Sequence, residues 1–164
     1  MRTKLALLVV LVVWGALAVS AELRVPEEFK TIQEAINAAA VGDTITVAPG
    51  TYVENLTIAK RGLTIRGADP EQVIVQAKFA DDPVVLLRER DVVLIGLTVT
   101  GGQRGVQVES RADNPVLANL VIRGNRGEGL FVEGVRGGEL RDSLITENGK
   151  GVYVSNRAAF RLQG

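Results

Sequence analysis

Short runs of alternating hydrophobic and polar residues fill the second half of the chain, and they recur at a fixed spacing. Segments that begin at Asp91, Asn114 and Gly137 align with a step of 23 residues, with small shifts at the turns. The step places leucines at equivalent positions, Leu94, Leu117 and Leu140. A period of about 20–50 residues is typical of solenoids, so residues 91–164 are predicted to form regular structural repeats.

Each repeat holds three short strand-like runs and no helical pattern, and after its bend comes a glycine followed by alternation, as in Gly151–Val154. This arrangement predicts an all-β fold, a single-stranded parallel β-helix. Each strand then pairs with its equivalent one coil away, at about 4.8 Å. The alternative is a meander of hairpins with Asn148-Gly149 as a tight turn. A meander does not require equivalent positions to recur at a fixed step, so the repeat favours the β-helix.

The alternation also predicts which side chains face the core. Aliphatic residues are expected to point inward in rows: Val106, Val108, Leu130, Val132, Val152 and Val154, and Leu94, Leu117, Leu140 and Leu162. Gln107, Phe131 and Tyr153 are then expected to point outward from one sheet, with the two rings on neighbouring coils. Asn125 and Asn148 occupy the same bend position and are expected to form an amide ladder that satisfies backbone groups.

Residues 22–43 are predicted to form an N-terminal cap that contains one helix. Thr31 and Glu34 have the spacing of a capping box, and Gly42 is expected to end a helix of about ten residues. The segments TITVAPGTY, ENLTIAKRGLTIRGAD and QVIVQA then predict further strands before the repeats. The whole β-helix domain, residues 22–164, is expected to have four or five coils.

The first 21 residues have the features of a secretory signal peptide. Arg2 and Lys4 precede an uncharged apolar run of 15 residues, Leu5–Val19, and small residues follow, with cleavage expected after Ala21. The alternative is an uncleaved membrane anchor, but the run is short for a span of about 20 residues. We therefore expect a secreted or periplasmic protein with no membrane span after cleavage.

The composition narrows the chemistry further. The sequence has no histidine and no cysteine, and its one methionine is Met1. Zinc and iron–sulfur sites built on those ligands, histidine-based triads and disulfides are therefore excluded. Oxygen ligands remain, so calcium is the metal that the composition still allows. Because 19 basic residues balance 19 acidic ones, we expect no nucleic-acid partner.

The segment FKTIQEAINAAAVGDTITVAPGTYVENLTIAKRGLTIRGAD resembles the N-terminal cap and first coils of pectin-lyase-like right-handed β-helix proteins. It is similar to the start of pectin methylesterases and of β-helix proteins of the NosD type, and residues 91–164 resemble the generic repeats. The resemblance implies a right-handed helix over nearly the whole mature chain. It does not by itself imply an activity, because this fold carries lyases, hydrolases, esterases, binding proteins and structural proteins.

Motifs for these activities are missing from the sequence. The paired aspartate motifs of pectin methylesterases are absent, and the one Asp pair, Asp81-Asp82, precedes Pro83 in an expected solvated corner. Glu109 and Glu133 follow equivalent strands near Arg111 and Arg136, which favours a surface charge ladder over a calcium site. Asn55-Leu56-Thr57 has the pattern of a glycosylation acceptor.

The sequence therefore predicts a polysaccharide- or cell-envelope-binding, or structural, module without a catalytic site of its own. Candidate binding residues lie on the outer sheet face: Gln107, Phe131, Tyr153, Glu109 and Glu133. One alternative is the N-terminal part of a pectin-lyase-like enzyme whose catalytic coils lie beyond residue 164. A second is a NosD-type periplasmic accessory protein, although the absence of histidine and cysteine and the single methionine, Met1, argue against copper binding by this chain. Residues 161–164 align with an interior position of the repeat, so we expect a truncated chain, with a further coil or a partner chain covering that end.

Overall fold

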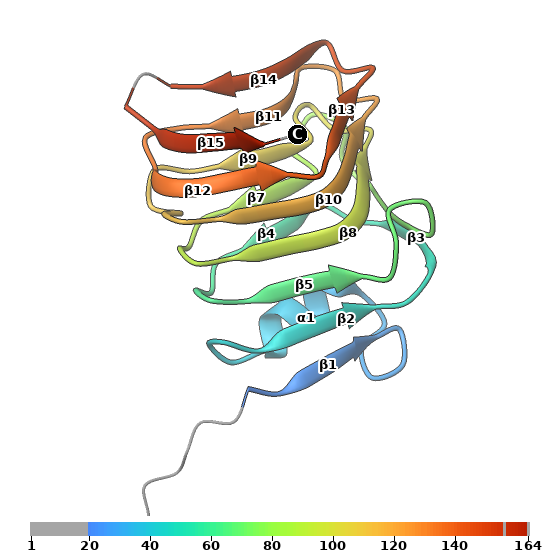
Figure 1. The fold of residues 1–164 in the computed structure, drawn as a ribbon. Helices are drawn as coiled ribbons and strands as arrows, with labels where there is room; N and C mark the ends of the chain where they lie inside the picture. Colours follow the sequence, from blue (N-terminus) through green and yellow to red (C-terminus); the bar gives the residue numbers. More distant parts are fainter. Residues whose placement is uncertain (1–19, 156, 164) are drawn as a thin grey trace, which may run out of the picture.

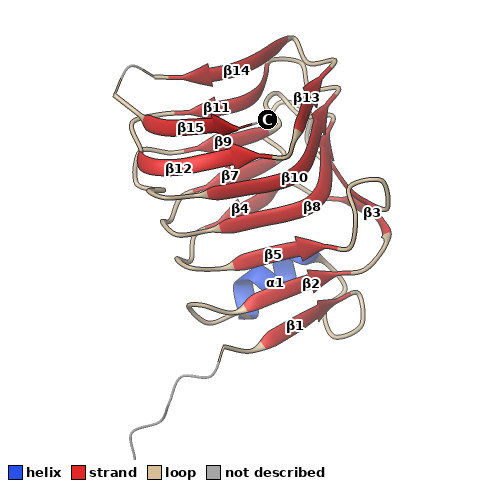
Figure 2. Ribbon diagram, in the orientation of Figure 1, coloured by secondary structure: helices blue, strands red, loops and turns tan. Residues whose placement is uncertain are grey.

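The computed structural model describes residues 20–155 and 157–163 and forms a parallel β-solenoid of about six turns. Figure 1 shows the strands stacked in successive rows, and Figure 2 shows that strands and turns make up nearly all of the described chain. Most of the expected signal peptide, residues 1–19, lies outside the described residues. The all-β expectation is confirmed, but the solenoid has more turns than the four or five predicted. The extra coils come from the irregular region before Asp91, where the sequence repeat is not visible.

The main sheet follows one side of the solenoid, and its strands pair in parallel. Its seven strands, in spatial order, are β1 (Glu22–Val25), β2 (Thr44–Val47), β5 (Thr64–Gly67), β8 (Val93–Thr100), β10 (Val116–Arg123), β12 (Arg136–Arg141) and β15 (Ala159–Gln163). Shorter strands continue this sheet around a corner: β3 (Gly50–Val53), β6 (Val73–Gln76) and β13 (Leu144–Thr146). The long strands β8 and β10 span both sides of that corner.

A second parallel sheet forms the opposite side. Its strands, in spatial order, are β4 (Leu56–Ile58), β7 (Val85–Leu87), β9 (Val106–Val108), β11 (Glu128–Val132) and β14 (Lys150–Val154). No hairpin joins β13 to β14. Each pairs instead with a strand of the preceding coil, β10 and β11 respectively. Asn148-Gly149 is therefore part of a bend between two sheets, as the repeat predicts.

The corner within β8 depends on two glycines that face each other in adjacent coils. Gly96 has φ +73°, a left-handed conformation that side chains disfavour. A Cβ added to Gly67 in β5 would lie 2.2 Å from the carbonyl oxygen of Gly96. Asn119 holds the equivalent corner of β10, also with positive φ. The backbones at this corner approach too closely for a methyl group at either glycine.

The register repeats at the step read from the sequence. Leu94 pairs with Leu117, and Leu117 pairs with Leu140, so equivalent residues are 23 apart. All three leucines are buried. The same row continues to Leu162, which pairs with Leu140 but is 56% exposed. Val152 likewise continues a buried row and is 39% exposed, because no described coil covers the last turn.

The one helix of the described chain, α1 (Ile32–Ala38), is shorter than predicted, with seven residues. The capping box is present: the Thr31 side chain accepts from the Glu34 amide, and Glu34 accepts from the Thr31 amide. The expected end at Gly42 is wrong, because Ala39 already leaves the helical conformation, with ψ 147°. Gly42 lies in the turn that follows, with φ +88°.

Helix α1 covers the first edge of the second sheet. The Gln33 side chain accepts a hydrogen bond from the Thr57 amide at 2.8 Å and donates one to the Thr57 carbonyl at 3.3 Å. It thus satisfies the two groups that an adjacent strand would bond. The helix buries its own Ile32, Ala35 and Ile36 side chains. The predicted N-terminal cap is confirmed at this edge of the solenoid.

Candidate functional site

A row of outward-facing side chains crosses the second sheet from coil to coil. Parallel pairing aligns Leu86 with Gln107, Gln107 with Phe131, and Phe131 with Tyr153. Their strand neighbours, such as Val106 and Val108 on either side of Gln107, are fully buried. The alternation therefore places this row on the outer face, as the sequence predicts. Leu86, Gln107 and Phe131 are partly buried, whereas Tyr153 is 48% exposed.

The rings of Phe131 and Tyr153 stack face to face. Their centroids are 4.9 Å apart and their planes differ by 10°. Two rings that lay side by side in one plane could not come this close. Each ring therefore turns a face to the other and an edge to the solvent. The guanidinium of Arg104 lies 4.0 Å from the Phe131 centroid. Both faces of Phe131 are therefore occupied, and a ligand can reach only its edge.

A network of charged side chains adjoins this aromatic pair. The Glu128 carboxylate pairs with Arg104 at 3.0 Å and with Lys150 at 3.2 Å. Arg104 also donates to the side-chain oxygen of Gln107 at 2.9 Å. Only 11% of the Glu128 side chain is exposed, whereas 75% of that of Lys150 is. The network links three neighbouring coils and fixes Arg104 over the Phe131 ring.

The hydrogen bond from Arg104 holds the pKa of Glu128 below its ordinary value, with Lys150 acting in the same direction. The carboxyl group therefore stays ionised at neutral pH. A general acid needs a raised pKa, so Glu128 is poorly suited to donate a proton in catalysis. The network instead offers fixed, planar hydrogen-bonding groups beside an aromatic ring.

Sequence reasoning missed Arg104, Glu128 and Lys150. A signal was present, because Glu128 and Lys150 both stand two residues before the first inward-facing residue of their strands, Leu130 and Val152. Opposite charges at equivalent positions of adjacent repeats predict a cross-strand ion pair. The contact of Arg104 with Phe131 had no comparable signal, since it depends on how the bend before β9 turns.

The two other candidate carboxylates lie directly after the C-terminal ends of β9 and β11 in the same sheet. Glu109 and Glu133 follow Val108 and Val132, which pair with each other, so they occupy adjacent coils as expected. Their predicted neighbours are different, however. Glu109 pairs with Arg88 at 3.5 Å, and Arg136 pairs with Asp113 at 3.1 Å. No group of three acidic side chains suited to a metal occurs among the described residues.

The paired asparagines lie inside the bend that leads into β11 and β14. Asn125 is 3% exposed, and its amide donates to Oδ1 of Asn148 at 2.9 Å. Its own Oδ1 accepts from the Gly102 amide of the preceding coil at 3.0 Å. The expected ladder is therefore present, and its partners are backbone groups of the bends. Its role is structural.

The remaining residues that the sequence singled out lie in the loop between β6 and β7 or, in the case of Asn55, contact it from the segment between β3 and β4. Asp81 is exposed and pairs with Arg126 at 2.5 Å. The Asn55 amide donates to the carbonyls of Phe79 and Pro83, and its oxygen accepts from the Phe79 amide at 2.7 Å. Asn55 thus anchors the loop, and both of its amide hydrogens are engaged. Attachment of a glycan there would break one of these bonds.

Within residues 20–155 and 157–163, no helix has the length and apolar character needed to cross a bilayer.

Comparison with known proteins identifies the family to which this architecture belongs. A family model described as "Right handed beta helix region" matches residues 32–164. Over 137 residues the chain is 28% identical to a cell surface glycoprotein of Methanothermus fervidus. The matched region covers 80% of this chain and 22% of that protein. The chain therefore spans less than a quarter of that relative's length.

Solved structures with the same fold include two polysaccharide-modifying enzymes. An alginate lyase from Paenibacillus sp. str. FPU-7 matches with a TM-score of 0.74 and 21% identity, over 88% of this chain and 57% of that one. The pectin methylesterase PemA from Erwinia chrysanthemi matches with a TM-score of 0.60 and 16% identity, over 78% and 49%. At such identities the likeness shows the fold alone.

Proposed function

Because the chain belongs to the right-handed β-helix family, we propose that it acts as a binding module whose outer sheet face attaches to a polysaccharide or another cell-envelope component. The family hosts many activities, so the proposal rests on this chain's own surface. The observation that carries it is the outward-facing Arg104–Phe131–Tyr153 stack on this sheet.

Tyr153 is the exposed member of the stack in the described chain. It is 48% exposed, and β14 is the edge strand of its sheet in the described chain. The ring face turned away from Phe131 is therefore uncovered by any described strand. A sugar ring can lay its C–H face against an aromatic ring while its hydroxyl groups bond to planar polar groups nearby. Gln107 and Arg104 supply planar groups within the same row and network, and Lys150 adds an ammonium donor.

An extracytoplasmic location is part of the proposal. The apolar segment Leu5–Val19 and the small residues after it have the pattern of a secretory signal. The similar protein from Methanothermus fervidus is named a cell surface glycoprotein. A module that binds an envelope polymer is useful on the outer side of the membrane, secreted or periplasmic.

Binding to a panel of envelope and plant polysaccharides tests this function. Tyr153→Ala should abolish most binding, and Phe131→Ala should weaken it because Tyr153 then loses its support. Phe79→Ala is the matched control, since Phe79 is 57% exposed but lies in the loop between β6 and β7. If Tyr153→Ala and Phe131→Ala both bind like the parent protein, this face is not the binding surface.

An enzymatic role is the second candidate. It is favoured by the shared fold with the alginate lyase, of which this chain covers 57%. In that case the chain would form part of a larger catalytic groove. Release of unsaturated or reducing sugars from polysaccharide by the described chain alone would establish catalysis and overturn the binding-only proposal.

A further inference from the structure

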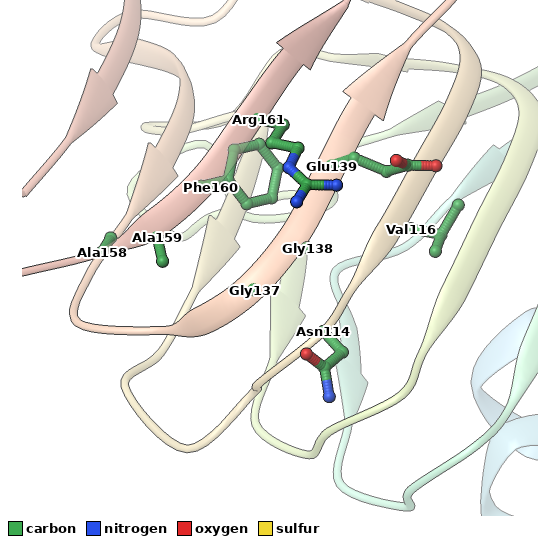
Figure 3. A pocket seen from close by; sticks show the side chains of 9 residues that line it. All are labelled: Asn114, Val116, Gly137, Gly138, Glu139, Ala158, Ala159, Phe160 and Arg161. Carbon is green, nitrogen blue, oxygen red and sulfur yellow. The ribbon is translucent and has the colours of Figure 1, made fainter.

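A hollow of about 720 Å³ lies on the outer face of the main sheet, over β12 and β15. Figure 3 shows the side chains around it, which come from β10, β12 and β15 and from the segments directly before β10 and β15. This hollow belongs to a different sheet from the Tyr153 row. Its volume lies in the range of about 300–1,000 Å³ that is usual for small-molecule sites.

The hollow lies over a β-bulge. Between β12 and β15, Arg136 pairs with Ala159 and Glu139 pairs with Arg161, so β12 contains one extra residue. The residues within the bulge are Gly137 and Gly138, with φ +89° and +106°. Bulges of this kind are frequent next to binding and active sites, where they redirect the strand.

Positive φ and close contacts with the preceding coil both disfavour a side chain at these two glycines. A Cβ on Gly137 would lie 2.3 Å from Oδ1 of Asn114, and one on Gly138 would lie 2.6 Å from Pro115. At these two residues the floor of the hollow is main chain, bordered by Oδ1 of Asn114 and by the ring of Pro115. Ala159, on the adjacent strand, adds only a methyl group to the wall.

Three polar side chains from successive coils surround this floor: Asn114, Glu139 and Arg161. The amide nitrogen of Asn114 donates to Asp91 at 3.2 Å, whereas its oxygen lies over Gly137. The Glu139 carboxylate is 3.3 Å from Arg141. Within residues 20–155 and 157–163, no carboxylate forms an ion pair with Arg161. The two nearby carboxylates in the sequence, Glu139 and Asp142, both pair with Arg141. The hollow thus offers two acceptors and one cationic donor.

We propose that this hollow binds an uncharged sugar unit. An anionic ligand would satisfy Arg161 but would be repelled by Glu139, and a cationic ligand would meet the reverse problem. A neutral sugar carries adjacent hydroxyl groups, each of which both donates and accepts. It can therefore donate to Asn114 and Glu139 while accepting from Arg161. This second site is separate from the Tyr153 row and gives the module contacts on two faces.

The test measures binding of the protein to an array of neutral gluco-, manno-, galacto- and xylo-oligosaccharides. Oligogalacturonate and oligoalginate serve as acidic probes on the same array. The strongest neutral probe is then measured by calorimetry against Ala159→Phe, which fills the hollow, and Arg161→Ala, which removes the donor. Each variant should bind roughly tenfold more weakly or worse. Ala59→Phe is the matched control, because Ala59 is exposed on the turn after β4.

The outcomes separate this site from the Tyr153 row. Loss of neutral-sugar binding in Ala159→Phe and Arg161→Ala, with unchanged binding in Ala59→Phe, supports the hollow. The proposal is overturned if the parent binds no neutral probe, if it binds only acidic ones, or if Ala159→Phe binds like the parent. Thermal unfolding of each variant identifies any loss that is due to misfolding, and Arg161→Ala, at an exposed position, then decides.

Discussion

The buried amide of Asn125 donates to Oδ1 of Asn148 in the next coil, at 2.9 Å. The same Oδ1 accepts from the backbone amide of Asn125 at 3.0 Å, and the Asn148 amide donates to the carbonyl of Ile122 at 2.9 Å. Each asparagine therefore satisfies backbone groups of the coil before it. The bends of adjacent coils are joined by this pair as the strands are joined by their ladders.

Asn125→Ala should destabilise the protein more than Asn148→Ala. The Asn125 side chain accepts from the Gly102 amide, and its loss leaves that buried donor unpaired. An unsatisfied buried group costs about 1–3 kcal/mol. Asn148 is only partly buried, so water can replace some of its bonds. Urea unfolding of the two variants measures the difference, and equal losses would contradict the ladder's dependence on burial.

Gly67→Ala should be poorly tolerated, because the new Cβ would lie 2.2 Å from the backbone oxygen of Gly96. Overpacking of a rigid core costs about 1–3 kcal/mol, and here the obstacle is main chain, which cannot change rotamer. Gly151→Ala is the matched control, with nothing within 4 Å of its Cβ position. Thermal unfolding should show a clear drop for the first variant and little change for the second. A Gly67→Ala protein as stable as the parent would mean that the two coils lie further apart.

Glu128→Gln should reduce stability in a pH-dependent way. Since the folded pKa of Glu128 is lowered chiefly by Arg104, its ion pairs stabilise the fold above the ordinary glutamate pKa of about 4.3. That contribution is lost as the pH falls through the lowered folded pKa. The parent should therefore exceed the variant by about 1–3 kcal/mol at pH 7, and the gap should narrow below about pH 4.

Urea unfolding at pH 7, 5, 4 and 3 measures that gap. Glu133→Gln is the control, because Glu133 is exposed and no ion pair of Glu133 occurs in the described part of the chain. It should follow the parent at every pH. A gap between parent and Glu128→Gln that persists unchanged to pH 3 would argue against ionic pairing of Glu128 in the folded state.

Asn55→Asp should loosen the loop between β6 and β7. The substitution replaces two donated hydrogen bonds by a carboxylate that faces the carbonyl oxygens of Phe79 and Pro83. Hydrogen exchange of residues 78–83 should accelerate, while the strands of both sheets keep their protection. Asn37→Asp is the control, because the exposed Asn37 side chain uses its oxygen to accept from Gln33 and keeps that acceptor. Equal exchange in parent and Asn55→Asp would show that the loop does not depend on this anchor.

The repeat predicted the parallel pairing correctly because each coil buries the same positions. Leu94, Leu117 and Leu140 recur at 23 residues in the sequence, and they stack in the core at that step. That Phe131 and Tyr153 lie next to each other on adjacent coils followed from the same register. The number of coils was underestimated because the early coils vary in length, as the pairing of Ile65 with Leu94, 29 residues apart, illustrates.

The sequence by itself determined the fold class, the register of the regular coils and which side chains face outward. These features follow from the spacing of the hydrophobic residues, because every coil buries the same positions. Tertiary structure decided how those outward side chains meet. The position of Arg104 over Phe131 and the bulge at Gly137-Gly138 both depend on the geometry of bends between sheets. Bends are set by backbone conformation and by contacts with the neighbouring coil, which no local pattern of hydrophobic residues encodes.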